Sequence, residues 1–189
     1  MKNQFKTLFS LLACIVLSLN IVITVNAKES DFTPYLSTID NDVIILQDCT
    51  YTEDDAIIHE RILFYPDKTN SEYYIMGTSK SGAGTFKAEK EYTFTTYTNK
   101  PKMTYYAQGY FKWNSETGDV SVSNAKGGHS NNLKDIKFSN EKTNKGVSQY
   151  GYIFNNFAYV NYSFTTTNIF GATKDFEVEI RVSENGNTL

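Results

Sequence analysis

The stretch FAYVNYSFT, residues 157–165, alternates apolar and polar side chains with a period of two. One side of an extended chain would carry Ala158, Val160, Tyr162 and Phe164, and the other Tyr159, Asn161, Ser163 and Thr165. This pattern is typical of a β-strand with one buried face and one solvent-exposed face. The stretch DFEVEIRVS, residues 175–183, repeats it, with Phe176, Val178, Ile180 and Val182 expected to face inward. The two stretches predict half-buried strands and a core built by a sheet.

Most of the remaining chain has the composition of strands. Seven further segments are rich in Tyr, Phe, Val, Ile and Thr: 43–50, 72–78, 85–97, 103–113, 119–123, 133–138 and 148–154. Turn-forming residues separate the segments, at 81–84, 99–101, 116–118, 126–128 and 155–156. We therefore expect an all-β fold, an antiparallel β-sandwich of about 8–10 strands. A closed up-and-down β-barrel is the alternative, because chain length and strand number suit it too.

One segment combines the features of a helix and of a strand. Thr52 followed by Glu53, Asp54 and Asp55 has the form of a capped helix start, so a short helix near residues 53–62 is an alternative. The β-branched isoleucines that follow, and Pro66 at the end of the run, favour a strand instead.

The first residues have the features of a secretory signal peptide. Two lysines precede an apolar run from Thr7 to Val25, and small residues end at Ala27. We expect cleavage after Ala27 and a secreted, extracellular product, whose only membrane contact is the signal segment itself. An uncleaved anchor is one alternative, because the run is long enough to span a bilayer. Lipid attachment at Cys14 is another.

The remaining chain, residues 28–189, is predicted to form a single domain. About 160 residues are enough for one hydrophobic core. The leader contains two of the 18 Lys and Arg and none of the 21 Asp and Glu, so the mature chain has a net charge of −5. This balance argues against nucleic acid as a partner. Only Cys49 remains after cleavage, which excludes an internal disulfide and is common in exported proteins of Gram-positive bacteria.

The sequence lacks the motifs of familiar catalytic sites. His59-Glu60 begins like a zinc-protease helix, but Leu63 stands where the second ligand belongs. A hydrolase would need Cys49 to meet His59 or His129, and a cysteine beside an apolar run is usually a core residue. We expect no catalytic residues, no resident metal and no cofactor. Calcium is the one ion considered, because nine carboxylates lie between Lys28 and Glu60, although the EF-hand pattern fails.

Tyrosines on the exposed faces are the candidate binding residues. A tyrosine ring can pack while its hydroxyl group stays in water, and groups of such rings mark binding surfaces. The candidates are Tyr106, Tyr110, Tyr152, Tyr159 and Asn161. We expect Tyr152 near Tyr159, because a tight turn at residues 155–156 would fold residues 148–154 back against 157–166. An ordinary solvent-exposed sheet surface would have the same residues.

From GYFKWNSETGDVSVS to YSFTTTNIFGATKDFEVEIRVSENG, within residues 100–187, the sequence resembles small exported single-domain β-rich proteins of Gram-positive bacteria, whose function is uncharacterised. The resemblance implies an exported β-domain and identifies no catalytic or binding position. We expect a non-enzymatic binding module that contacts a cell-wall glycan or an extracellular protein. The alternatives are a small-ligand-binding β-barrel, a secreted toxin or inhibitor-like factor, and a Cys/His hydrolase.

Overall fold

The computed structural model describes residues 43–54, 56–69, 80–96, 98–130, 133–148 and 156–189. These residues form eight strands and no helix. The strands are β1 (Ile44–Glu53), β2 (Ala56–Pro66), β3 (Ser81–Phe94), β4 (Lys102–Asn114), β5 (Asp119–His129), β6 (Ile136–Ser148), β7 (Phe157–Asn168) and β8 (Thr173–Ser183).

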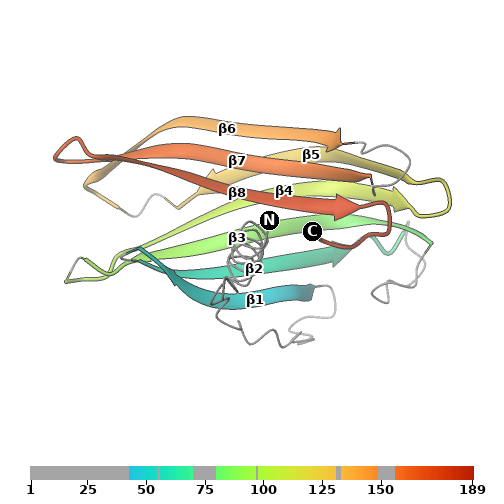
Figure 1. Cartoon of the computed structure of the whole chain (residues 1–189), viewed down its shortest axis with the longest axis horizontal. Coiled ribbons are helices and arrows are strands. Elements are labelled where there is room, and N and C mark those ends of the chain that lie inside the picture. Colours follow the sequence, from blue (N-terminus) through green and yellow to red (C-terminus); the bar gives the residue numbers. More distant parts are fainter. Residues whose placement is uncertain (1–42, 55, 70–79, 97, 131–132, 149–155) are drawn as a thin grey trace, which may run out of the picture. The chain divides into compact units, whose positions relative to one another are not determined.

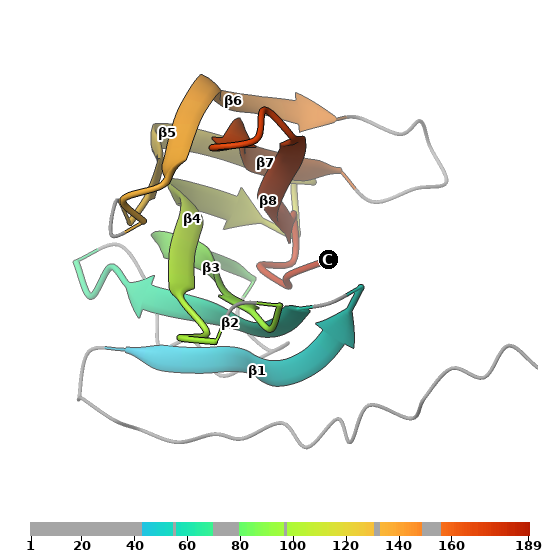
Figure 2. The ribbon, with the colours of Figure 1, turned by 90° about the vertical axis from the view of Figure 1, so that its left-hand side faces the viewer.

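The strands form two antiparallel sheets that pack as a sandwich. The first sheet has the order β1-β2-β3-β4-β5, and the second has the order β6-β7-β8. β8 packs against β3 and β4, β7 against β4 and β5, and β6 lies next to β5. Both ribbon views place β1 and β2 farthest from β6 (Figures 1 and 2). The expected sandwich is confirmed, and the closed barrel is wrong because the strands divide into two separate sheets.

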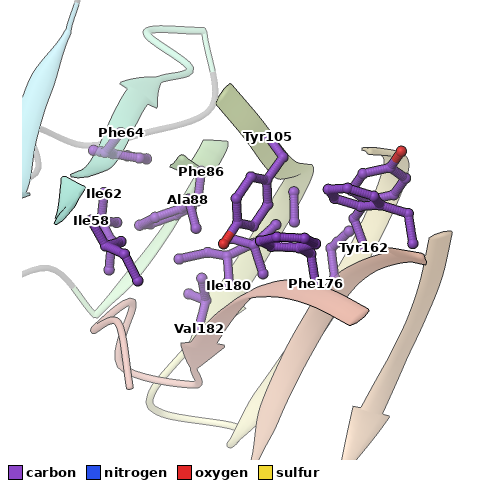
Figure 3. Close-up of a cluster of buried hydrophobic side chains, with 14 of the residues drawn as sticks. Ile58, Ile62, Phe64, Phe86, Ala88, Tyr105, Tyr162, Phe176, Ile180 and Val182 are labelled. Carbon is purple, nitrogen blue, oxygen red and sulfur yellow. The ribbon is translucent and has the colours of Figure 1, made fainter. Parts of the chain in front are cut away.

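The core lies between the sheets and is rich in aromatic rings. Phe64 and Phe86 stack with ring centroids 4.4 Å apart, and Phe164 and Phe176 stack at 5.3 Å. Tyr105 makes edge-to-face contacts with the rings of Phe164 and Phe176, at centroid distances of 5.4 and 5.7 Å. Figure 3 shows Tyr105 beside Phe176 between the sheets. Offset and edge-to-face pairs of this kind add to the free energy gained by burying the rings.

The alternation predicted for the last two strands is confirmed. Ala158, Val160, Tyr162 and Phe164 of β7 are buried, as are Phe176, Val178, Ile180 and Val182 of β8. The predicted turns at 99–101 and 116–118 also lie between strands.

The helix considered near residues 53–62 is wrong. Residues from Ala56 onward form β2, in which Ile58 is buried and Ile57 is exposed. In a helix, neighbouring isoleucines would lie only about 100° apart, whereas strand pairing places them on opposite faces. The burial of every second residue favours the strand.

Two predicted turns lie inside strands. Residues 81–84 belong to β3, and residues 126–128 belong to β5. An added Cβ would lie 2.3 Å from the Trp113 ring at Gly82 and 2.4 Å from the Phe64 ring at Gly84. At Gly127 it would lie 2.2 Å from the Tyr162 ring. These glycines therefore make room for large rings within the sheet.

Two predicted strands fall on residues outside the described ranges. Residues 72–78 and 149–154 are among them, as are Tyr152 and the first residue of the predicted 155–156 turn. The register pairs Ser148 with Phe157, and the rest of β7 pairs with the earlier residues of β6 on one side and with β8 on the other. The prediction that residues 148–154 form the hairpin partner of 157–166 is therefore wrong. Within the described residues, no helix is long and apolar enough to cross a membrane.

Candidate surface on the three-stranded sheet

The solvent-exposed side of β7 carries the residues predicted for it. Tyr159, Asn161, Ser163 and Thr165 lie on the side opposite the core, and we call these four residues the outer β7 face. β7 is the central strand of its sheet, so both neighbours contribute side chains to the same surface. Six residue steps separate Tyr159 from Thr165, so this surface is about 20 Å long.

In the strand register, each residue of the outer β7 face lies between one residue of β6 and one residue of β8. Across from the outer β7 face, β6 presents Gly146, Asn144, Lys142 and Ser139, and β8 presents Arg181, Glu179, Glu177 and Asp175. Three carboxylates and one guanidinium group therefore line one side of β7. A lysine and small polar residues line the other side.

Hydrogen bonds hold several of these polar groups in place. Asn161 donates from Nδ2 to Glu177, and Thr165 donates to Asp175 at 2.7 Å. The Asn140 amide donates to the Thr165 hydroxyl oxygen at 3.2 Å. Asn161 itself is only 8% exposed, so its amide is largely fixed by its neighbours. A ligand would meet donors and acceptors that are already oriented.

The aromatic part of the surface lies at the Phe157 end. The Tyr159 ring lies across Gly146, where an added Cβ would be 2.8 Å from the hydroxyl oxygen. Gly146 thus lets the ring rest close to the sheet. The Phe157 and Tyr159 ring centroids are 6.5 Å apart, and the Arg181 guanidinium carbon lies 5.3 Å from the Phe157 ring centre. Arg181 also donates to Glu179.

These side chains border a shallow depression. Its lining includes Phe157, Tyr159, Asn161, Glu179, Arg181 and Lys142. A second depression lies farther along the strand, next to Ser163 and Thr165. Glu177 lines both, so the two form adjoining parts of one surface.

Tyr106 and Tyr110 lie on the other sheet. Both belong to the outer face of β4, as their alternation predicted, and therefore do not join Tyr159 in one patch. The Lys87 ammonium group lies 4.8 Å from the centre of the Tyr106 ring. The Tyr110 hydroxyl donates to Asp67 at 2.6 Å. Intramolecular contacts thus already occupy these two tyrosines.

The thiol and imidazole needed for a hydrolase do not meet in the described residues. Cys49 pairs with Glu60 and His59 with Thr50 in the β1–β2 register, so Cys49 and His59 face opposite sides of the sheet. His59 instead contacts Asp48 at 2.5 Å. Cys49 is partly buried, on the core side of the sheet, and accepts a hydrogen bond from the Gln47 amide at 3.5 Å.

A second polar cluster lies where β5 meets β6. The His129 ring stacks on Phe138 with centroids 3.8 Å apart, and its Nε2 lies 3.5 Å from Glu141. Tyr162 donates from its hydroxyl group to Glu141 at 3.1 Å. Burial and the nearby Glu141 carboxylate raise the pKa of the Tyr162 hydroxyl group, which keeps it a donor. This cluster joins the two sheets at their edge.

No group of three or more metal-ligating side chains is found in the part of the chain that the structure describes. Of the nine carboxylates considered for calcium, five lie outside the described ranges: Glu29, Asp31, Asp40, Asp42 and Asp55. Asp54 is described, and its carboxylate lies 3.4 Å from the Lys174 ammonium group.

Sequence reasoning missed the β6 and β8 contributions to the candidate surface. Alternation showed that Glu177, Glu179 and Arg181 face outward, but only the strand register shows that they flank Tyr159 and Asn161. Nothing in the sequence near Gly146 indicated that a tyrosine ring rests on it. No protein-family model, curated protein or solved structure matches the chain.

Proposed function

We propose that the protein is an exported, non-enzymatic binding module that holds an extended polar ligand, a cell-wall glycan, on the outer β7 face. The observation that carries the proposal is the row of pre-oriented polar groups beside the Tyr159 ring. Asn161 and Thr165 are each hydrogen-bonded to a carboxylate of β8, so their positions do not have to be ordered on binding.

The chemistry of the surface suits a sugar chain. A sugar ring offers hydroxyl groups that donate and accept hydrogen bonds, and an apolar side that stacks on an aromatic ring. The surface provides carboxylate acceptors in Glu177 and Glu179 and cationic donors in Lys142 and Arg181. Because both signs of charge are present, the surface favours a neutral or mixed-charge polymer over a strongly charged one.

The surface is also shaped for an extended ligand. It follows the central strand of a sheet, and its two depressions adjoin at Glu177. A flat, elongated surface contacts several units of a polymer at once, and each weak contact adds to the affinity.

Binding of the protein purified from culture medium to insoluble cell-wall peptidoglycan and to a glycan array tests the proposal. We expect Tyr159→Ala and Asn161→Ala to reduce retention by about tenfold, the loss typical of one aromatic or hydrogen-bonding contact. Tyr106→Ala is the matched control, because it removes a tyrosine ring from the outer face of the other sheet.

Circular dichroism and thermal unfolding establish that each variant is folded. Equal retention of wild-type protein and of folded Tyr159→Ala and Asn161→Ala would contradict binding at the outer β7 face. Failure of the wild-type protein to bind any glycan would contradict the ligand class.

A further inference from the structure

The turn between β7 and β8 exposes two large apolar side chains. Phe170 is 86% exposed and Ile169 is 69% exposed, the two highest values among the large hydrophobic residues that the structure describes. The loop lies at the left-hand extremity of the ribbon in Figure 1. Loop tips usually carry small or polar residues, and a pair of adjacent exposed apolar side chains indicates a contact surface.

The turn holds these side chains in a defined conformation. The Asn168 side-chain oxygen accepts hydrogen bonds from the backbone N–H groups of Phe170 and Ala172, both at 3.0 Å. The Asn168 backbone exchanges hydrogen bonds with Ala172 and Gly171, also at 3.0 Å. Gly171 has a φ of +80°, a conformation that glycine adopts without strain. The exposure of Phe170 is therefore built into the hairpin.

Cationic side chains lie beside the tip. Lys137 pairs with Thr167 in the β6–β7 register, one residue before Asn168. Lys134 and the exposed Asp135 come directly before Ile136, the first residue of β6, which pairs with Asn168. Both lysines are exposed, and neither forms an ion pair with a carboxylate among the described residues. Lys174, just after the turn, is already paired with Asp54 at 3.4 Å.

We propose that this tip inserts Ile169 and Phe170 into the interfacial region of an anionic lipid bilayer. A stable protein interface buries a large complementary area, which two side chains on a convex turn do not offer. A bilayer accepts an apolar tip without such complementarity, and exposed lysines beside it favour anionic headgroups. The proposal does not depend on glycan binding and adds a membrane contact beyond the signal segment.

A tryptophan at the tip reports its environment directly. In Phe170→Trp, we expect the added fluorescence to shift to shorter wavelength with vesicles of phosphatidylcholine and phosphatidylglycerol, and brominated lipids to quench it. The wild-type protein has one tryptophan, Trp113, which is buried at 3% exposure. The fluorescence of the wild-type protein with the same vesicles is therefore the background to subtract from that of Phe170→Trp. This readout is local and is therefore independent of any binding through the signal segment.

Sedimentation of the protein recovered from culture medium, with the same vesicles, measures the contribution of each side chain without the apolar leader. We expect Phe170→Ser to weaken partitioning by about tenfold or more, because a buried phenylalanine is lost. Lys137→Gln should weaken binding to the anionic vesicles but not to phosphatidylcholine alone. Val147→Ser is the matched control, since Val147 is 46% exposed near the other end of β6.

Two results would overturn the proposal. One is a fluorescence spectrum of the Phe170→Trp variant that anionic vesicles leave unchanged, which is also the result expected if the tip binds only a protein. The other is equal partitioning of the wild-type protein and Phe170→Ser.

Discussion

Glu89 is a single residue whose charge contributes to stability. It lies on the outer face of β3, and its side chain is 13% exposed. The carboxylate accepts hydrogen bonds from Lys87 and from Arg61, the latter at 2.5 Å. Burial alone would raise the pKa of this carboxyl group, but the hydrogen bonds and charges of Lys87 and Arg61 lower it below the ordinary value of 4.5. The folded chain therefore favours the ionised form.

We expect Glu89→Gln to lower the free energy of unfolding by about 1–2 kcal/mol at pH 7, because two charge-assisted hydrogen bonds are weakened. Since the folded-state pKa is lowered, the stabilisation is complete above pH 4.5 and is lost as the pH falls through the folded-state pKa. Urea unfolding at pH 7 and at about pH 3 should show the difference between wild-type protein and variant shrinking in acid.

Glu116→Gln provides the control for Glu89→Gln. It weakens the Lys80–Glu116 pair, whose side chains are 77% and 59% exposed, and such exposed pairs contribute little. Equal losses in the two variants at pH 7 would show that the pairing of Glu89 has no special effect.

At the scale of elements, β2 shows how burial decides between helix and strand. Its first residues follow a helix-like Thr-Glu-Asp-Asp start, yet the chain pairs with both β1 and β3. Ile58 faces the core at 3% exposure, and Ile57 faces solvent at 38%. The gain from burying Ile58 and pairing two strands exceeds the small preference that helix-capping residues provide.

The neighbouring residues Ile57 and Ile58 allow a test of the assignment of β2 as a strand. We expect Ile58→Ala to lower the free energy of unfolding by about 2–4 kcal/mol, because it leaves a cavity in the core. Ile57→Ala makes the same chemical change on the exposed face and should cost less than about 1 kcal/mol. Chemical denaturation measures both. Similar losses for the two variants would contradict the strand alternation.

The extents of β5 and β6 were predicted poorly for an identifiable reason. Both are edge strands of their sheets, and much of β6 beyond Phe138 is exposed and polar, so apolar alternation does not mark it. Asn140 in β6 has a φ of 55°, at a register shift between Ser139 and Lys142. Such a bulge breaks the period of two on which strand prediction depends.

At the scale of the whole molecule, the division between leader and domain is the main prediction. Residues 1–27 have the features of a signal peptide. We expect protein recovered from culture medium to begin at Lys28, as measured by N-terminal sequencing. Protein that remains in the membrane fraction with an intact N-terminus, or with lipid on Cys14, would contradict this prediction.

The sequence by itself determined the fold class and the faces of the best-patterned strands. Alternation in β4, β7 and β8 identified the apolar core residues correctly, because strand geometry sends successive side chains to opposite faces. It also placed Tyr159 and Asn161 on the side of β7 opposite the core. Asn161 is the exception in exposure: it lies on the outer side of β7 as predicted but is only 8% exposed, because the neighbouring strands cover it. The face on which a strand residue lies depends only on its position along the strand, so the local sequence pattern is enough to predict it.

Only the tertiary structure decided which strands are neighbours and therefore which residues form one surface. Tyr106 and Tyr159 have the same local pattern, but strand pairing puts them on different sheets. Pairing also set Glu177 beside Asn161 and Gly146 beneath the Tyr159 ring. Pairing joins residues that are distant in the chain, and the free energy that selects it comes from the packing of both sheets together. No single segment contains that information.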